Sequence, residues 1–235
     1  MIPTLLIAGN FLREQRWFLV FLLLYVAMLS LVYGLSPPTD LRDLLVLEKQ
    51  LAAFALLFSL SIVTGSLQQE RRTRRIIAVL SKGISRRDYI AGFLLGSVVI
   101  SGIYCAGMVA SAAGLHSRIE FPLQPILGLI AVTLMACVLT NSIALFYATT
   151  LHPLFAMLAT GMTVGLPFIL AEIFGSRALN IIAVASLVDG IRDFALVGGW
   201  RFPVLTMWLA IVQTVLFWLA AAWVFSRKDV AVPVE

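Results

Sequence analysis

The chain has 235 residues, of which 61% are hydrophobic and only 12% are charged. Soluble domains are about half apolar and a quarter charged, so this composition excludes an ordinary soluble domain and indicates a membrane protein. The net charge of +5 does not indicate nucleic-acid binding, because the basic residues cluster between apolar segments and are not spread over a polar surface with interleaved aromatic residues.

The N-terminal segment, residues 3–13, is predicted to form a short amphipathic helix along the membrane interface. It lacks the basic leader, apolar stretch and small-residue cleavage site of a secretory signal. The side chains expected to face lipid are Leu5, Leu6, Phe11 and Leu12. An ordinary extension of the first membrane span is the alternative.

Uncharged intervals predict six transmembrane helices, because a helix needs about 20 apolar residues to cross the hydrocarbon. Four intervals each fit one helix, and the longer interval 121–171 fits two helices joined by a turn before Pro153, since proline can begin a helix. The predicted spans are residues 17–36, 50–69, 90–113, 124–148, 153–173 and 203–225. We therefore expect a single all-α transmembrane domain over residues 1–235.

Residues 174–201 are predicted to form an irregular segment on the outer side, before the last span. The stretch 181–197 is rather apolar, but Asp189, Arg192 and Asp193 fall in its middle, where hydrocarbon would make each charge costly. Short re-entrant or interfacial helices are expected there, lying where protein or water satisfies their polar groups.

Lysines and arginines divide unequally between the two sides of this predicted topology. Eleven fall on the side that holds both termini and six on the other. The positive-inside rule makes the side with eleven basic residues cytoplasmic, so both termini are expected in the cytoplasm.

The largest predicted cytoplasmic loop is the charged segment 70–89, between the second and third spans. Its arginines precede an apolar block, Gly83 is placed to end a helix, and Ser85 is placed to cap the next helix three residues before Asp88. A helix, a turn and a second helix are therefore predicted. On the charge run alone, anchoring to acidic lipid is the favoured interpretation.

Glu70, followed by Leu-Ser-Lys-Gly-Ile-Ser-Arg-Arg-Asp-Tyr over residues 80–89 and then Gly92, resembles the permeases of type-two ATP-binding cassette (ABC) exporters. In that family a glutamate near the cytoplasmic end of the second span precedes a block of leucine, serine, a small turn, Ser-Arg and tyrosine that leads into the third span. Topology is similar over nearly the whole chain, whereas sequence likeness is confined to residues 70–89. Phe93 departs from the family, which often has lysine there.

The resemblance implies a permease subunit without its own ATPase domain, in the cytoplasmic (inner) membrane of a prokaryote. Segment 70–89 would be a coupling helix that docks on a cytoplasmic ABC ATPase, present in two copies, beside a second permease chain that is identical or homologous. The implied coupling residues are Glu70, Arg74, Arg75, Ile77, Leu80, Arg86 and Arg87. ATP and Mg would bind to the ATPase, because this chain has no phosphate-binding G-x-x-x-x-G-K-[ST] motif.

Three residues within or at the end of the spans are candidates for a translocation path. Asn141 is the most polar side chain deep in a span, although a hydrogen bond across helices is the default interpretation. Pro167 should kink the fifth span, either at a gated path or as a static bend. Glu172 is a functional candidate at the membrane edge, or it simply reaches water. The G-x-x-x-G patterns at 92–96 and 161–165 favour packing within the chain over a dimer interface.

No catalytic, cofactor or metal site is expected. Cys105 and Cys137 lie in separate apolar segments and are interpreted as core packing, and His116 and His152 are predicted on opposite faces of the membrane. The uniformly apolar spans favour a hydrophobic or amphipathic cargo, with membrane lipids as neighbours and no nucleic acid. The remaining alternatives are a haem-exporter-type permease of cytochrome c maturation and a non-transporting membrane assembly protein.

Overall fold

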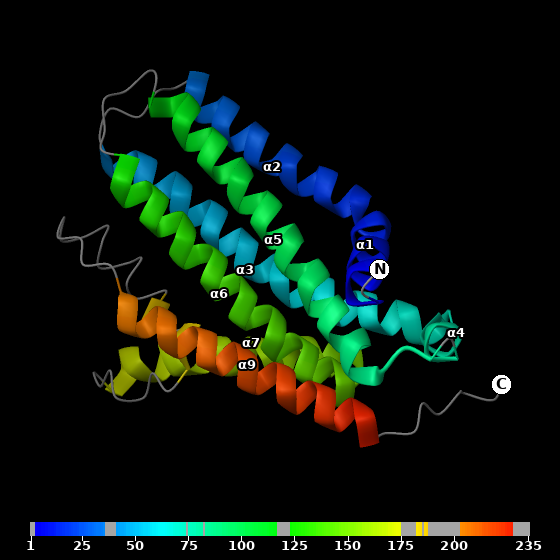
Figure 1. The fold of residues 1–235 in the computed structure, drawn as a ribbon. Helices are drawn as coiled ribbons and strands as arrows, with labels where there is room; N and C mark the ends of the chain where they lie inside the picture. The colour runs from blue at the N-terminus through cyan, green and yellow to red at the C-terminus, as the bar shows by residue number, and fades with distance from the viewer. Residues whose placement is uncertain are drawn as a thin grey trace.

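A computed structural model of the chain describes residues 3–35, 41–73, 75–81, 83–116, 123–174, 182–184, 186–187 and 203–227. Regular structure in these residues is entirely helical, which confirms the predicted all-α class. The helices are α1 (Pro3–Glu14), α2 (Arg16–Leu35), α3 (Leu41–Arg72), α4 (Arg75–Leu80), α5 (Arg86–His116), α6 (Leu123–Thr150), α7 (Pro153–Phe174) and α9 (Val204–Arg227) (Figure 1).

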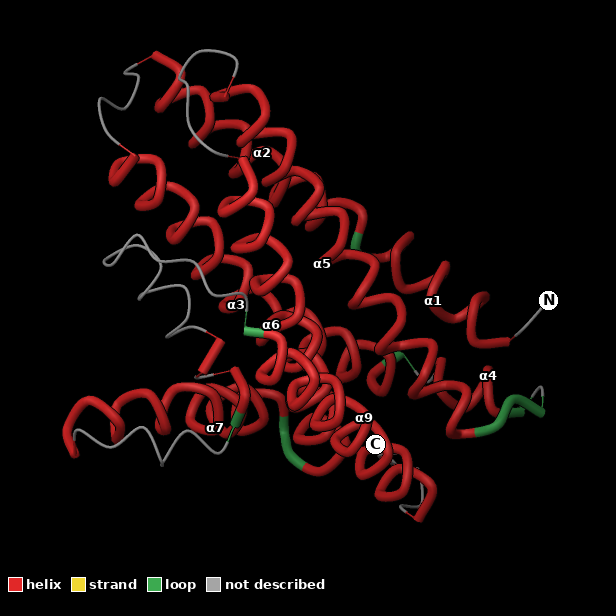
Figure 2. Tube along the Cα trace, turned by 60° about the vertical axis from the view of Figure 1, so that its left-hand side comes forward, coloured by secondary structure: helices red, strands yellow, loops and turns green. Residues whose placement is uncertain are grey.

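Five of these helices are long and apolar enough to cross a membrane, so the chain is a multi-pass membrane protein. They are α2, α3 from Val46, α5, α6 from Ile126, and α9. The predicted fifth span corresponds to α7, whose apolar stretch Pro153–Pro167 is shorter. In Figure 2, α7 projects sideways from the bundle at a steep angle to α3 and α6. The predicted fifth span, and with it the total of six, therefore stays a prediction.

Helix α6 forms the centre of the bundle. Of the apolar stretch of α6, 72% is buried inside the protein, against 11% of the apolar stretches of α2 and α9. A helix that is apolar around its whole circumference suits this central place, because it meets protein on every side. Helices α3 and α5 run beside α6, and α2 lies against α5 at the edge (Figure 1).

One end of the bundle, named here the α4 end, gathers α1, α4, the start of α5 and the end of α9 (Figure 1). The arginines of the described residues at this end are Arg13, Arg16, Arg71, Arg72, Arg75, Arg86, Arg87 and Arg227. The predicted charge asymmetry thus corresponds to one physical end of the molecule. Which side of the membrane that end faces stays a prediction.

Helix α1 packs on α5, and one expected lipid contact is wrong. Leu5 and Leu6 are about half exposed, as expected, whereas Leu12 is half-buried and packs against the main core. Phe11 is only 3% exposed and meets the ring of Phe93 edge-on, with centroids 4.7 Å apart. Phe11 is buried because Gly96 has no side chain, so a Cβ placed there would lie 2.7 Å from the Phe11 ring. The first G-x-x-x-G pattern therefore packs two helices of the same chain.

Little of the predicted outer segment 174–201 falls within the described residues. Ala183, Val184 and Leu187 are fully buried in a cluster with residues of α6 and α9. The backbone N–H of Ala183 donates to the Gln213 side-chain oxygen at 2.9 Å. This part lies against the bundle, and the rest of the segment lies outside the described residues.

Candidate functional site

The connection from α3 to α5 contains the predicted helix, turn and helix. Gly83 has a φ of 79°, a backbone conformation that favours glycine, and its N–H donates to the Leu80 carbonyl at 3.1 Å, which ends α4. Ser85 caps α5, because its Oγ accepts from the Asp88 N–H at 3.1 Å and donates to the Asp88 carboxylate at 2.7 Å. Both local predictions are confirmed.

Two side-chain contacts attach the start of α5 to other long helices. The Tyr89 hydroxyl donates to the Glu70 carboxylate of α3 at 3.1 Å. The Arg86 guanidinium donates to the carbonyls of Phe225 and Ser226, in the last turn of α9, at 3.3 and 3.1 Å. A cation bonded to the final carbonyls of a helix also meets the negative end of the helix dipole.

A third contact joins α3 to α6. The Arg71 guanidinium donates to the carbonyl of Thr149, near the end of α6, at 3.2 Å. Together the three contacts, named here the end braces, connect the ends of α3, α5, α6 and α9 beside α4. Sequence reasoning missed Arg71, since nothing local separates it from its neighbours in the arginine run.

The remaining predicted coupling residues differ in what they present to solvent. Ile77 is 38% exposed on α4, and Arg87 is exposed at the start of α5. Leu80 is half-buried and packs against the main hydrophobic core. Arg74 and the side chain of Arg75 lie outside the described residues. Ile77 and Leu80 are the two apolar residues predicted to contact the ATPase, and Ile77 is the more exposed of them.

Of the three predicted path residues, the structure describes the side chains of Asn141 and Pro167. Asn141 is fully buried, and its Nδ2 donates across the bundle to Ser101 Oγ of α5 at 3.2 Å, which is the default interpretation of this residue. Pro167 lies half-buried inside α7. The Glu172 side chain lies outside the described residues.

Glu48 is a buried polar residue that the sequence analysis did not single out. It is fully buried in α3, and neither carboxyl oxygen has a hydrogen-bond partner within the described residues. A lone carboxylate is costly in apolar surroundings. Leu51, Ala52 and Ala55 are buried at helical spacing from Glu48, so all four residues lie on one inward face of α3.

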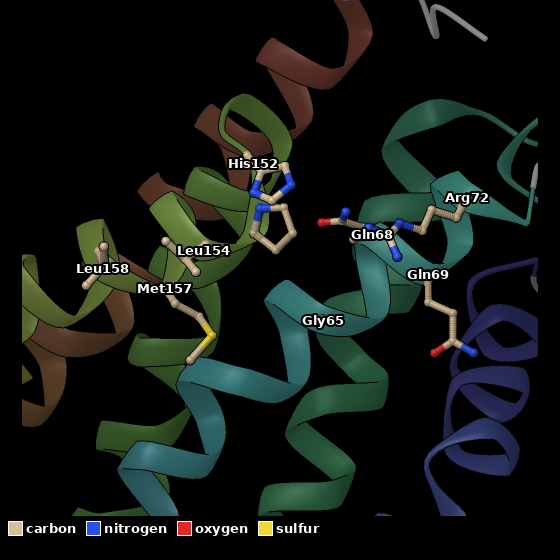
Figure 3. A pocket seen from close by; sticks show the side chains of 9 residues that line it. Gly65, Gln68, Gln69, Arg72, His152, Leu154, Met157 and Leu158 are labelled. Atoms are coloured by element: carbon tan, nitrogen blue, oxygen red, sulfur yellow. The ribbon is translucent and has the colours of Figure 1, made fainter. Parts of the chain in front are cut away.

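An open groove of about 740 Å³ lies between α3 and α7 at the α4 end (Figure 3). Its lining residues are Gly65, Gln68, Gln69, Arg72, His152, Pro153, Leu154, Met157 and Leu158. The α3 residues recur at helical spacing on one face, and those of α7 belong to its first turns. The groove could not be predicted from sequence, because it depends on the angle between the two helices.

Within the described part of the chain, no three His, Cys, Asp or Glu side chains lie close enough together to hold a metal ion. The described residues present a braced, charged helical connection and a groove beside it. No protein-family model matches the chain, and no curated protein sequence is significantly similar to it.

Proposed function

We propose that this chain is the permease subunit of an ATP-driven ABC exporter. In this proposal α7 completes six spans, the α4 end faces the cytoplasm, and α4 with its flanking turns docks on a separate ATPase. Two permease chains and two ATPase subunits form the transporter, since closed symmetric assemblies are the commonest. The cargo is hydrophobic or amphipathic.

The observation that carries this proposal is the set of end braces beside α4. A coupling element must pass a displacement on to the helices that surround the cargo. The bonds of Tyr89 to Glu70, Arg86 to Phe225 and Arg71 to Thr149 attach the neighbourhood of α4 to four long helices. A push on α4 would therefore reach several helices together.

Charge supports the orientation in the proposal. Eight of the nine arginines in the described residues lie at the α4 end, Arg42 at the start of α3 being the exception, and basic residues are enriched on the cytoplasmic side of membrane proteins. An ATPase that uses cytoplasmic ATP must dock on that same side. The two requirements agree on one end of the molecule.

Ile77 supports a protein contact at α4. The α4 end is the polar, arginine-rich end, yet 38% of this isoleucine is exposed there. The buried core of a protein interface is more apolar than the rest of the protein surface, and arginine is enriched at interfaces. Arg87 is exposed at the start of α5, the helix that follows the turn after α4.

The test is reconstitution of the chain with candidate ABC ATPases, beginning with any that an adjacent reading frame encodes. We expect the two to co-purify, and Ile77→Asp to reduce stimulated ATPase turnover by about tenfold, the equivalent of one lost interface contact. Arg13→Gln is the matched control, because Arg13 is an exposed arginine of α1 at the same end. It should leave turnover unchanged.

A second variant separates docking from transmission. Tyr89→Phe keeps the buried ring that stacks near Phe225 but removes the bond to Glu70. Binding of the ATPase should persist, while stimulated turnover falls. The proposal would be contradicted if the chain never acquires a partner ATPase, or if Ile77→Asp keeps full stimulated ATPase turnover. An ATPase complex that moves no cargo would identify an assembly protein instead.

A further inference from the structure

We infer that the groove between α3 and α7 is a binding site for an anionic phospholipid, with the phosphate headgroup at Arg72 and the acyl chains beside Met157 and Leu158. The inference does not depend on the chain being a transporter, because a multi-pass protein meets lipid whatever its activity.

The two ends of the groove differ in chemistry. Polar side chains lie where the groove meets the α4 end: Arg72 and Gln68 come from the last turns of α3, and His152 from the turn before α7 (Figure 3). Leu154, Met157 and Leu158 follow along α7 and are 61%, 41% and 57% exposed. This division matches a phospholipid, whose polar headgroup stays at the interface while its chains enter the hydrocarbon.

Charge at the polar end selects an anion. Arg72 is the charged residue among the described lining residues, and no acidic residue is among them. With the Gln68 amide oxygen turned toward it, that oxygen accepts from Nε and Nη2 of Arg72 at 3.3 Å, which orients the guanidinium. A guanidinium has five N–H donors, so others stay available for phosphate oxygens. The nearby carboxylate of Glu70 instead accepts from Tyr89.

Gly65 creates the space for an acyl chain. It is exposed in the groove wall, and a Cβ placed there would have no atom within 4 Å. A larger side chain would therefore enter the groove without disturbing the helices. The groove is open on one side, and its volume of about 740 Å³ is within the range of specific ligand sites.

The experiment measures lipid retained by the purified chain after exchange into nanodiscs containing equal phosphatidylglycerol and phosphatidylcholine. We expect the wild-type chain to retain phosphatidylglycerol about tenfold over phosphatidylcholine, as one charge-assisted contact implies. Arg72→Gln should abolish that preference and Arg13→Gln should keep it. Gly65→Leu should reduce retention of both lipids, whereas Gly161→Leu, at an open α7 glycine outside the groove lining, should not.

Four outcomes would overturn the inference. Wild-type preference in Arg72→Gln would show that Arg72 does not select the net negative charge of the headgroup, and equal loss in Arg13→Gln would show a general surface-charge effect. Displacement of the lipid by soluble glycerol phosphate would indicate a soluble phosphate ligand. A dimer that Gly65→Leu dissociates, with lipid retention unchanged, would assign the groove to a second copy. None of these outcomes bears on ATPase docking.

Discussion

The junction of α1 with α5 and the junction of α3 with α7 lie at the same end of the molecule but use glycine in opposite ways. At Gly92, a Cβ would lie 2.8 Å from the Thr4 carbonyl oxygen and 2.7 Å from Ile7 Cβ. At Gly65, a Cβ would meet nothing within 4 Å. Glycine lets two helices touch in the first junction and leaves an open groove in the second.

This difference separates a fixed part of the molecule from an accessible part. The α1–α5 junction is closed by Phe11 against Phe93, and it continues into the main core around α3 and α6. The α3–α7 junction offers exposed methionine and leucine side chains. We expect substitutions in the closed part to change stability, and substitutions in the open part to change binding.

Gly92→Leu should have the largest effect. Because the new side chain would collide with the backbone of α1, the helix must be displaced, and overpacking of this kind costs about 3 kcal/mol in the free energy of unfolding. Denaturation in mixed detergent micelles measures the change. Gly102→Leu is the matched control on the same helix, with nothing within 4 Å of the added Cβ. Equal stability of the two variants would remove the distinction between closed and open junctions.

Glu48→Met should raise stability, by about 2 kcal/mol, because it removes a buried polar group whose oxygens have no partner within the described residues. Methionine is flexible enough to fill the same space. The same denaturation assay measures it. Glu70→Met is the contrast, since Glu70 accepts a bond from Tyr89 and its loss should lower stability. A destabilising Glu48→Met would show that the carboxyl group has a partner in the assembled protein.

Much of the fold was accessible from sequence because hydrocarbon cannot solvate charge, so uncharged intervals predict long helices. The turn at Gly83 and the cap at Ser85 were also predictable, since both depend on neighbouring residues. The burial of Glu48 was not predictable by counting charges, because that count places every ionisable residue outside the membrane. In the structure α3 begins at Leu41 and carries Glu48 into the protein core. Whether Phe11 faces lipid or protein depends on which helix α1 packs against. The sequence of α1 alone does not contain that information.

The candidate site was predictable only in part, because its contacts join residues that lie far apart in the sequence. Segment 70–89 was recognised from its charge run and motif, but the partners of Arg71 and Arg86 are carbonyls on α6 and α9, far away in sequence. Backbone carbonyls leave no residue-type signal. The end braces and the groove therefore had to come from the tertiary structure.

Tyr104→Phe should lower stability by about 1 kcal/mol, which tests how well the closed part satisfies its polar groups. The Tyr104 hydroxyl is buried and donates to the Leu51 carbonyl of α3 at 2.9 Å. Tyr25→Phe serves as control in the same denaturation assay, since the ring stacking with Phe54 at 4.0 Å would remain. If Tyr104→Phe leaves the free energy of unfolding unchanged, water or lipid replaces the lost hydrogen bond. This part of the molecule is then less closed than the packing indicates.

Gly65→Leu should have the smallest effect on stability, and its sign should be opposite to that of Gly92→Leu. Leucine is favoured over glycine in a helix by about 0.5–1 kcal/mol, and the open groove imposes no steric cost, so the free energy of unfolding should rise by a few tenths of a kcal/mol. The same substitution would therefore stabilise the protein at one glycine and destabilise it at the other. Denaturation of both variants in the same detergent measures the two changes in the free energy of unfolding. A clear loss of stability in Gly65→Leu would mean that the groove closes in the membrane, and that α3 and α7 pack there as tightly as α1 and α5.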